Sequence, residues 1–477
     1  MLLALLTMLV ANPPPLATPD TARLAPVCRR FIALDAARIW PGFRPDTLAV
    51  AFVVPERGTM LCNWRAAPPE GFTALGAPGL AWIDVASRSA ANTNAELAGR
   101  HVAQLVAEPD ATPAQLVYLA AHEAFHVFER GSRRAGRRFG GGENAFLVTS
   151  YPVFDRDNEA GFALEARVLA AALAAPGDSA ARSLAWEFLA LRDARQRALG
   201  SDGAEFERMA ELNEGLAEYA GLRAVQVGPL DPAWRDGAAR VAAQIAGRLD
   251  SVTTQSRNSL RLRFYATGPA LGRLLDRLAG GRWKTDLVRE DRTLQEELAA
   301  VTGYGTREAR LIATARARFD WPALAQSAAA TIASLESLRR AQRDSILAAP
   351  GIELVIDASA VGGMGTCGID PQNLLQAGQG VLLHRRWVRP CAGKALDAEF
   401  TTPVVQDQQA GTVRAVIGEE TTLRWTAGGT PLALPDGARL GDVRDLRLEA
   451  PLVTVQAAHV ALERSGRTVT VRLLPAS

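Results

Sequence analysis

The segment "HEAFH" carries two histidines and a glutamate at a spacing that suits metal chemistry. His122 and His126 are four residues apart, Glu123 follows the first histidine directly, and the chain of 477 residues contains only five histidines. Residues four apart share one face of a helix, so both imidazoles can reach one metal ion. Glu123 is displaced sideways toward a water held by that metal. The segment predicts a zinc site for hydrolysis; the competing interpretation is two histidines on an amphipathic face.

A hydrolytic zinc site has three protein ligands, and two glutamates compete to be the third. Glu214 lies in "NEGLAEYAG", where Glu218 follows four residues later and can accept a hydrogen bond from a ligating histidine. Glu159 lies in "NEAGFALEAR" and is nearer in sequence, but Glu165 is six residues on and points to another face. The shorter distance in sequence from His126 favours Glu159. The presence of Glu218, which could orient a ligating histidine, favours Glu214. We predict Glu214 as the ligand and keep Glu159 as the alternative; either could also be a structural carboxylate in an Ala-rich bundle.

Three motifs together resemble the gluzincin branch of zinc metallopeptidases. They are "HEAFH", "NEGLAEY" and "FYATGPALGRLLDRL" at residues 264–278. The resemblance implies a zincin-like catalytic region, Zn²⁺ as cofactor, and a peptide or protein substrate. It also implies individual roles: metal binding by His122, His126 and Glu214, proton transfer by Glu123, and stabilisation of the oxyanion by the hydroxyl of Tyr265.

The chain departs from that family in two places. The gap from His126 to Glu214 is much longer than in the family's best-known members, so we expect a helical insertion between the two ligand helices. The substrate-binding GxMEN segment of the aminopeptidases is missing before HExxH. "GGGEN" at residues 140–144 lies on the wrong side of the motif and is interpreted as a Gly-rich loop near the site. Exopeptidase activity is therefore not supported, and an endopeptidase is expected.

The elements that must position these residues form an α+β chain in four parts. Residues 1–27 hold an apolar segment and a Pro-rich linker, and residues 28–111 read as a mixed α/β lobe. Residues 112–349 are rich in Ala, Leu and Arg with helical periodicity, which predicts a helical metallopeptidase core. Its first helix begins with Thr112 as N-cap and a proline at the first position. Residues 350–477 alternate like short strands and predict an all-β domain.

Composition narrows the partners and the compartment. With a net charge of +2 and no long basic run, the chain lacks the basic surface that is typical of nucleic-acid-binding proteins. The first eleven residues, "MLLALLTMLVA", match a signal-peptide apolar region and are too short to span a bilayer, so no stable membrane span is expected; a disordered apolar N-terminus is the alternative. Two disulfides, Cys28–Cys62 and Cys367–Cys391, are predicted, and they fit export to the periplasm or outside the cell. The alternative is that the four cysteines are buried free thiols.

These observations favour an exported zinc-dependent peptidase that uses a zinc-bound water activated by Glu123. The alternative is a catalytically silent zincin-fold binding or scaffold protein that acts through residues 350–477. A third hypothesis is an intracellular metalloprotein of other chemistry. The remaining histidines, His101, His384 and His459, are expected to be structural or exposed. Nothing in the sequence indicates an oligomeric state or a cleavage preference.

Overall fold

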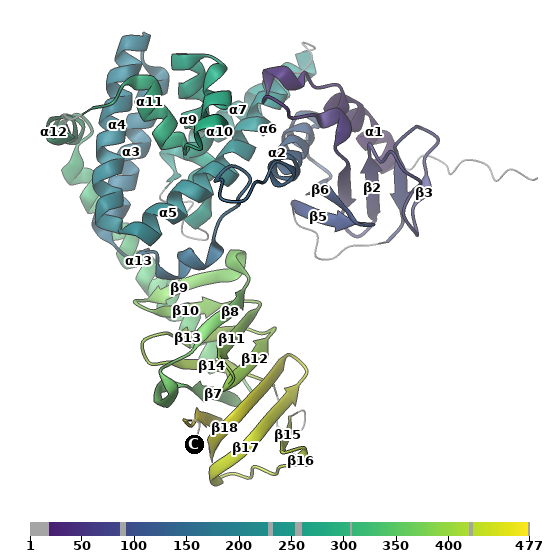
Figure 1. Cartoon of the computed structure of the whole chain (residues 1–477), viewed down its shortest axis with the longest axis vertical. Helices are drawn as coiled ribbons and strands as arrows, with labels where there is room; N and C mark the ends of the chain where they lie inside the picture. Colours follow the sequence, from purple (N-terminus) through teal and green to yellow (C-terminus); the bar gives the residue numbers. More distant parts are fainter. Residues whose placement is uncertain are drawn as a thin grey trace, which may run out of the picture.

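The chain folds into a mixed α+β structure with a helical core and a β-rich C-terminal region (Figure 1). The computed structural model describes residues 19–85, 92–227, 232–252, 260–305, 308–418 and 423–475. The predicted signal-peptide segment lies outside these residues. No helix in the described ranges combines the length and the apolar character needed to cross a bilayer.

The N-terminal region is a six-stranded mixed sheet that packs against α1 and α2. Its strands lie in the order β3-β4-β2-β1-β6-β5, in which β1 pairs parallel with β6 and the other pairs are antiparallel. Strand β1, "VAFVV", is buried along its whole length, as a parallel central strand requires. The elements are α1 (Pro19–Ile32), η1 (Ala36–Arg38), η2 (Pro45–Thr47), β1 (Val50–Val54), β2 (Gly58–Cys62), β3 (Thr73–Ala74), β4 (Ala81–Ile83), β5 (Thr93–Leu97) and β6 (Arg100–Val106).

Helix α1 begins inside the stretch that the sequence suggested as a linker. It starts at Pro19, and its side chains Leu24 and Val27 are buried in the core. The same hydrophobic cluster continues through the sheet and the helical region, so the two share one core. The predicted disulfide Cys28–Cys62 is formed and joins α1 to β2.

The helical core follows directly after β6 and carries the candidate site. Helices α3, α4 and α5 form the expected insertion between α2 and the segment that holds Glu214. The elements are α2 (Pro113–Gly131), η3 (Ala145–Ser150), α3 (Arg156–Ala174), α4 (Asp178–Leu199), α5 (Ser201–Ala210), η4 (Glu211–Gly215), α6 (Leu216–Gln226), α7 (Pro232–Asp250), η5 (Leu260–Arg263), α9 (Phe264–Ala279), α10 (Arg282–Glu290), α11 (Leu294–Thr302), α12 (Glu308–Arg318) and α13 (Trp321–Ala348).

The C-terminal region is β-rich, as predicted, and has its own hydrophobic core. Its main strand path runs β16-β15-β17-β18-β19-β7-β14-β13-β10-β9, and the second disulfide, Cys367–Cys391, links β8 to β11. The strands are β7 (Glu353–Asp357), β8 (Gly365–Ile369), β9 (Leu374–Gly378), β10 (Val381–His384), β11 (Val388–Ala392), β12 (Leu396–Phe400), β13 (Val404–Asp407), β14 (Thr412–Val416), β15 (Arg424–Ala427), β16 (Thr430–Pro431), β17 (Arg439–Ala450), β18 (Val453–Ser465) and β19 (Thr468–Leu473); η6 (Ser359–Val361) and η7 (Pro371–Asn373) are short turns between them.

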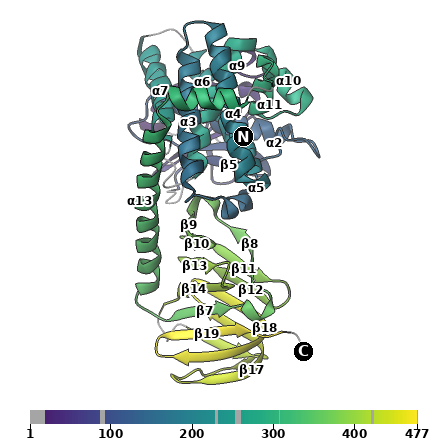
Figure 2. The same cartoon turned by 90° about the vertical axis from the view of Figure 1, so that its left-hand side faces the viewer.

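Helix α13 connects the helical core to the β-rich region. It packs against α3 and against β9, β13 and β14, and Figure 2 shows it running along both parts of the molecule. The candidate site lies away from this connection, between the N-terminal sheet and the helices that pack on α2.

Candidate metal centre

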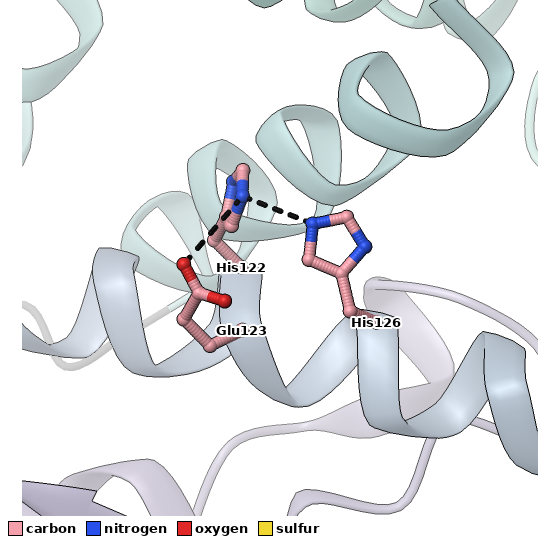
Figure 3. A group of neighbouring side chains, drawn as sticks. All are labelled: His122, Glu123 and His126. Carbon is pink, nitrogen blue, oxygen red and sulfur yellow. Dashed lines mark hydrogen bonds and ion pairs between the residues drawn. The ribbon is translucent and has the colours of Figure 1, made fainter. Parts of the chain in front are cut away.

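Helix α2 presents the two histidines of "HEAFH" on one face. The helix begins as predicted: the Thr112 hydroxyl accepts from the backbone N–H of Gln115, whose side chain accepts in turn from the backbone N–H of Thr112. This capping box fixes where the helix starts and therefore which residues face the core. His122 is buried and His126 is partly buried, and their side chains point toward each other (Figure 3).

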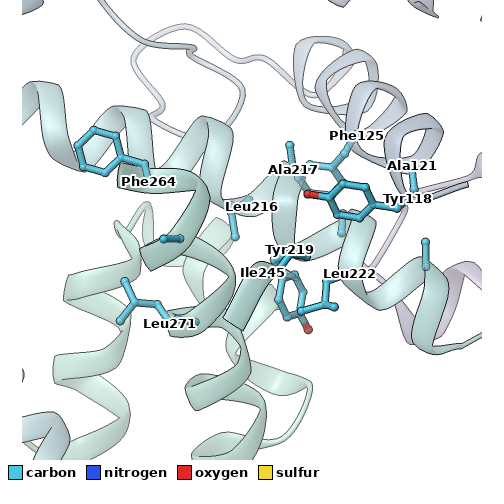
Figure 4. Packing of buried hydrophobic residues seen from close by; sticks show 14 of the residues in the cluster. Tyr118, Ala121, Phe125, Leu216, Ala217, Tyr219, Leu222, Ile245, Phe264 and Leu271 are labelled. Carbon is cyan, nitrogen blue, oxygen red and sulfur yellow. The ribbon is translucent and has the colours of Figure 1, made fainter. Parts of the chain in front are cut away.

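Helices α6 and α9 form the opposite wall of the site. Tyr118 and Phe125 of α2 belong to the buried cluster at the contact of α2 with α6, and α9 packs against α6 in turn (Figure 4). This packing places the N-terminal ends of α6 and α9 beside the histidine face of α2.

Glu214 lies on η4, a π-helical turn that joins α5 to α6. The turn crosses α9 very closely: a Cβ atom on Gly268 would lie 2.1 Å from Gly215 Cα. A preceding residue of the turn, Glu211, accepts hydrogen bonds from Thr267 of α9 and from Arg192 Nη1 of α4, the latter at 2.7 Å. Single π-helical turns of this kind are frequent at functional sites. Here the turn directs Glu214 toward α2.

Three donor atoms converge at the centre of the site. The Nε2 atoms of His122 and His126 are 3.2 Å apart, and Glu214 Oε2 lies 3.7 Å from the first and 3.6 Å from the second. Ligands about 2.0–2.1 Å from a tetrahedral ion are separated by about 3.3–3.4 Å, so these spacings fit a three-ligand metal site. Glu214 Oε1 accepts from Asn213 and Arg261, whereas Oε2 is buried with no hydrogen-bond donor among the described residues. Oε1 of Glu214 is thus held by hydrogen bonds within the protein, whereas Oε2 faces the two imidazoles.

Each histidine also has a glutamate at its other ring nitrogen. Glu218 Oε1 lies 3.4 Å from His122 Nδ1, and Glu129 Oε2 lies 3.5 Å from His126 Nδ1. Carboxylates in this position orient a ligating imidazole and raise its basicity. Glu218 is itself held by the hydroxyl of Tyr118 and by Arg248 Nη1, the latter at 2.9 Å.

The sequence reasoning identified Glu218 but missed Glu129. The residue lies three positions after His126, a spacing that places it beside the histidine on the helix surface. The longer pattern HExxHxxE in residues 122–129 was the available indication.

Glu123 is buried beside the cluster without belonging to the three converging atoms. Its Oε1 lies 3.9 Å from His122 Nε2, and His122, Glu123 and His126 together form a group that could hold a metal ion. Burial raises the pKa of Glu123, although the two histidines oppose the shift. A carboxylate of raised pKa is suited to exchange protons near neutral pH.

His122 and Glu214 shift each other's pKa. Burial lowers the pKa of His122, but its contacts with Glu214 and Glu218 outweigh burial and raise that pKa to about 9. Burial raises the pKa of Glu214, but the neighbouring His126 and His122 hold that pKa well below its ordinary value. The protein groups alone thus favour a charged Glu214 facing the imidazoles.

Tyr265 stands over the same cluster. Its ring stacks on His122 with centroids 5.8 Å apart and an interplanar angle of 23°. Burial, with a further contribution from Glu214, raises the pKa of the Tyr265 hydroxyl, which therefore stays protonated and able to donate. Near it, Arg261 forms ion pairs with both Glu214 and Glu143, and Glu143 belongs to the "GGGEN" loop.

The alternative ligand Glu159 lies elsewhere in the core. Its carboxylate pairs with Arg263, and the nearby Glu165 pairs with Arg192 and Arg195. The structure thus brings His122, His126 and Glu214 together and directs Glu159 and Glu165 to arginines.

A cavity of about 380 Å³ opens onto the three donor atoms. One wall is the start of β5, an edge strand of the N-terminal sheet. The lining includes Asn92, Thr93, Asn94, Glu129, Arg130, Arg133, Gly140, Gly141, Gly142, Asn213, Arg261 and Tyr265. The Gly-rich loop therefore lies near the site, as predicted.

The other three histidines lie outside this site. His384 is buried in the β-rich region, where its Nε2 lies 2.9 Å from Gln406 Oε1. His459 contacts Asp442, and His101 is exposed on β6. Comparison of the chain with protein-family models, curated proteins and solved structures finds no match.

Proposed function

We propose that this chain is a zinc-dependent peptidase with a zincin-like catalytic region of the gluzincin type. The observation that carries the proposal is the convergence of His122 Nε2, His126 Nε2 and Glu214 Oε2 at 3.2–3.7 Å from one another. Two imidazoles and one carboxylate form a ligand set typical of hydrolytic zinc sites. The two disulfides are typical of an oxidising compartment, and we propose that the chain is exported.

The proposed reaction divides its work among a few side chains. A divalent zinc ion at the three donor atoms would polarise the substrate carbonyl and lower the pKa of a coordinated water. Glu123 accepts a proton from the attacking water as the new C–O bond forms, and returns it to the leaving nitrogen as the C–N bond breaks. The Tyr265 hydroxyl donates to the carbonyl oxygen as that oxygen gains negative charge.

The edge strand β5 supports a peptide as the substrate. Strand order places β5 at the end of its sheet, and Thr93 and Asn94 line the same cavity as His122. An extended peptide can add to such an edge through main-chain hydrogen bonds. This arrangement would suit a chain that passes through the site, and we propose an endopeptidase.

Metal analysis combined with two variants tests the proposal. Elemental analysis of the purified protein is expected to give one zinc per chain, and chelation is expected to abolish hydrolysis of quenched fluorescent peptides. Glu123→Gln should keep the metal and lower kcat by about 10²–10⁴-fold, because it removes a proton acceptor that is not a ligand. His126→Ala should lose both metal and hydrolysis. A wild-type chain without metal, or a Glu123→Gln variant with full turnover, would overturn the proposal.

A further inference from the structure

Two arginines, one in the last turn of α2 and one just after it, line the candidate site and have no charged partner among the described residues. Arg130 and Arg133 are exposed, and both line the cavity that opens onto the histidines. Neither side chain forms a hydrogen bond or an ion pair with any residue in the described ranges. Two guanidinium groups are therefore available at the rim of this cavity.

Three other arginines near them are already engaged. Arg261 is paired with Glu143 and Glu214. Farther along the segment that follows α2, Arg137 contacts Asp291 and two backbone carbonyls, and Arg138 pairs with Glu296.

The carboxylates that line the cavity also have partners. Glu214 faces the histidines and Arg261, and Glu129 faces His126. These carboxylates face the interior of the site, and none of them forms an ion pair with Arg130 or Arg133.

We propose that Arg130 and Arg133 select peptide substrates that carry a carboxylate near the bond to be cleaved. The inference rests on the proposed peptidase function and names its substrate class. A carboxylate accepts two parallel hydrogen bonds from a guanidinium, which gives both charge and geometric complementarity. The unpaired arginines also attract anionic peptides before contact, an effect that salt screens. The carboxylate comes from an Asp or Glu side chain or from the C-terminus of the peptide.

Matched peptides separate these two sources. One pair differs by Glu against Gln next to the cleaved bond, with the C-terminus amidated in both. A second pair has Gln at that position and differs by a free against an amidated C-terminus. In at least one of the two pairs, the wild-type protein is expected to cleave the peptide with the additional carboxylate at the higher kcat/KM. Equal kcat/KM within both pairs would overturn the inference.

Variants at the rim connect the preference to the two arginines. Arg133→Ala should lower the ratio of kcat/KM between carboxylate and neutral peptides by about threefold to fivefold, as expected for an exposed charge pair. Arg130→Ala with Arg133→Ala should remove the preference, and Arg133→Glu should favour a Lys peptide over the Glu peptide. Arg134→Ala is the matched control: Arg134 is also exposed and, like Arg133, borders a neighbouring cavity, but it does not line the cavity that opens onto the histidines. A preference that survives the double variant, or falls equally in Arg134→Ala, would overturn the inference.

Binding measured without turnover separates this inference from the proposed function. Fluorescence anisotropy with the Glu123→Gln variant should show tighter binding of the carboxylate peptide, and the difference should vanish when Arg130 and Arg133 are both replaced. Arginine-dependent binding without hydrolysis in the wild type would refute the peptidase and leave the anion site standing. Hydrolysis with no arginine-dependent preference would refute the anion site and leave the peptidase standing.

Discussion

Replacing Glu129 by glutamine should change metal affinity and metal-free stability in opposite directions. The Glu129 side chain is 3% exposed, and its Oε2 lies 3.5 Å from His126 Nδ1. Burial raises the pKa of Glu129 from 4.5 to about 7, although His126 opposes the shift. The difference between these pKa values corresponds to about 3 kcal/mol at neutral pH.

The sign of the stability effect follows from proton binding. Between pH 4.5 and about 7, the folded chain holds a proton on Glu129 that the unfolded chain has released. The free energy of unfolding therefore falls as the pH rises through this window. In the chelated protein, Glu129→Gln removes this loss, so the variant should be more stable by up to about 3 kcal/mol at pH 7 and nearly unchanged below pH 4.5.

The metal-loaded protein should respond in the opposite way. Glutamine cannot supply the negative charge that raises the basicity of the His126 imidazole, and losing such a partner lowers metal affinity by about 10–100-fold. Competition with a colorimetric chelator measures the affinity, and thermal melts in EDTA between pH 4.5 and 8 measure the stability. Glu123→Gln is the matched control, a buried glutamate on the same helix that should keep its metal affinity. Unchanged affinity in Glu129→Gln, or a chelated variant that is less stable at pH 7, would refute the reasoning.

Three further variants test other parts of the structure. Tyr265→Phe should lower kcat by about 100-fold with unchanged metal affinity, because the hydroxyl acts only on the developing oxyanion; unchanged kcat would place the tyrosine in a packing role. Gly268→Ala should lower both Tm and metal affinity, because its Cβ would lie 2.1 Å from Gly215 Cα, whereas Gly281→Ala, with nothing within 4 Å, should not. Burial lowers the pKa of His384 to about 4, so wild-type stability should fall as the pH drops from 6.5 to 4. His384→Gln should reduce that loss by up to about 3 kcal/mol, and equal acid sensitivity of the two chains in thermal melts would argue against it.

Local patterns in the sequence were enough to predict the start of α2 and its histidine face. Thr112 followed by proline is a helix start that needs no distant contact, and the four-residue spacing then places His122 and His126 together. The alternating strands of residues 350–477 and both disulfides were likewise predicted and are formed. These features depend on residues close together in the sequence, or on pairing among only four cysteines.

The local pattern favoured Glu214 but left Glu159 as an alternative, because the choice between them depends on partners far along the chain. The sequence offers no direct indication that Arg263, 104 residues away, pairs with Glu159. Nor does it indicate that the segment 211–215 forms a π-helical turn, which lies in close contact with α9 at Gly215 and Gly268.

The long insertion between the two ligand helices has a structural role at the site. Arg192 of the inserted helix α4 bridges Glu165 of α3 and Glu211 of η4, and all three side chains are buried. Buried ion pairs seldom add stability beyond what apolar packing would give, but removing one partner leaves a costly unpaired charge. The network therefore constrains the relative positions of the inserted helices and the π-helical turn. Since Glu214 follows Glu211 by three residues on that turn, the insertion that separates the motifs in sequence also supplies the arginine that holds the second one in place.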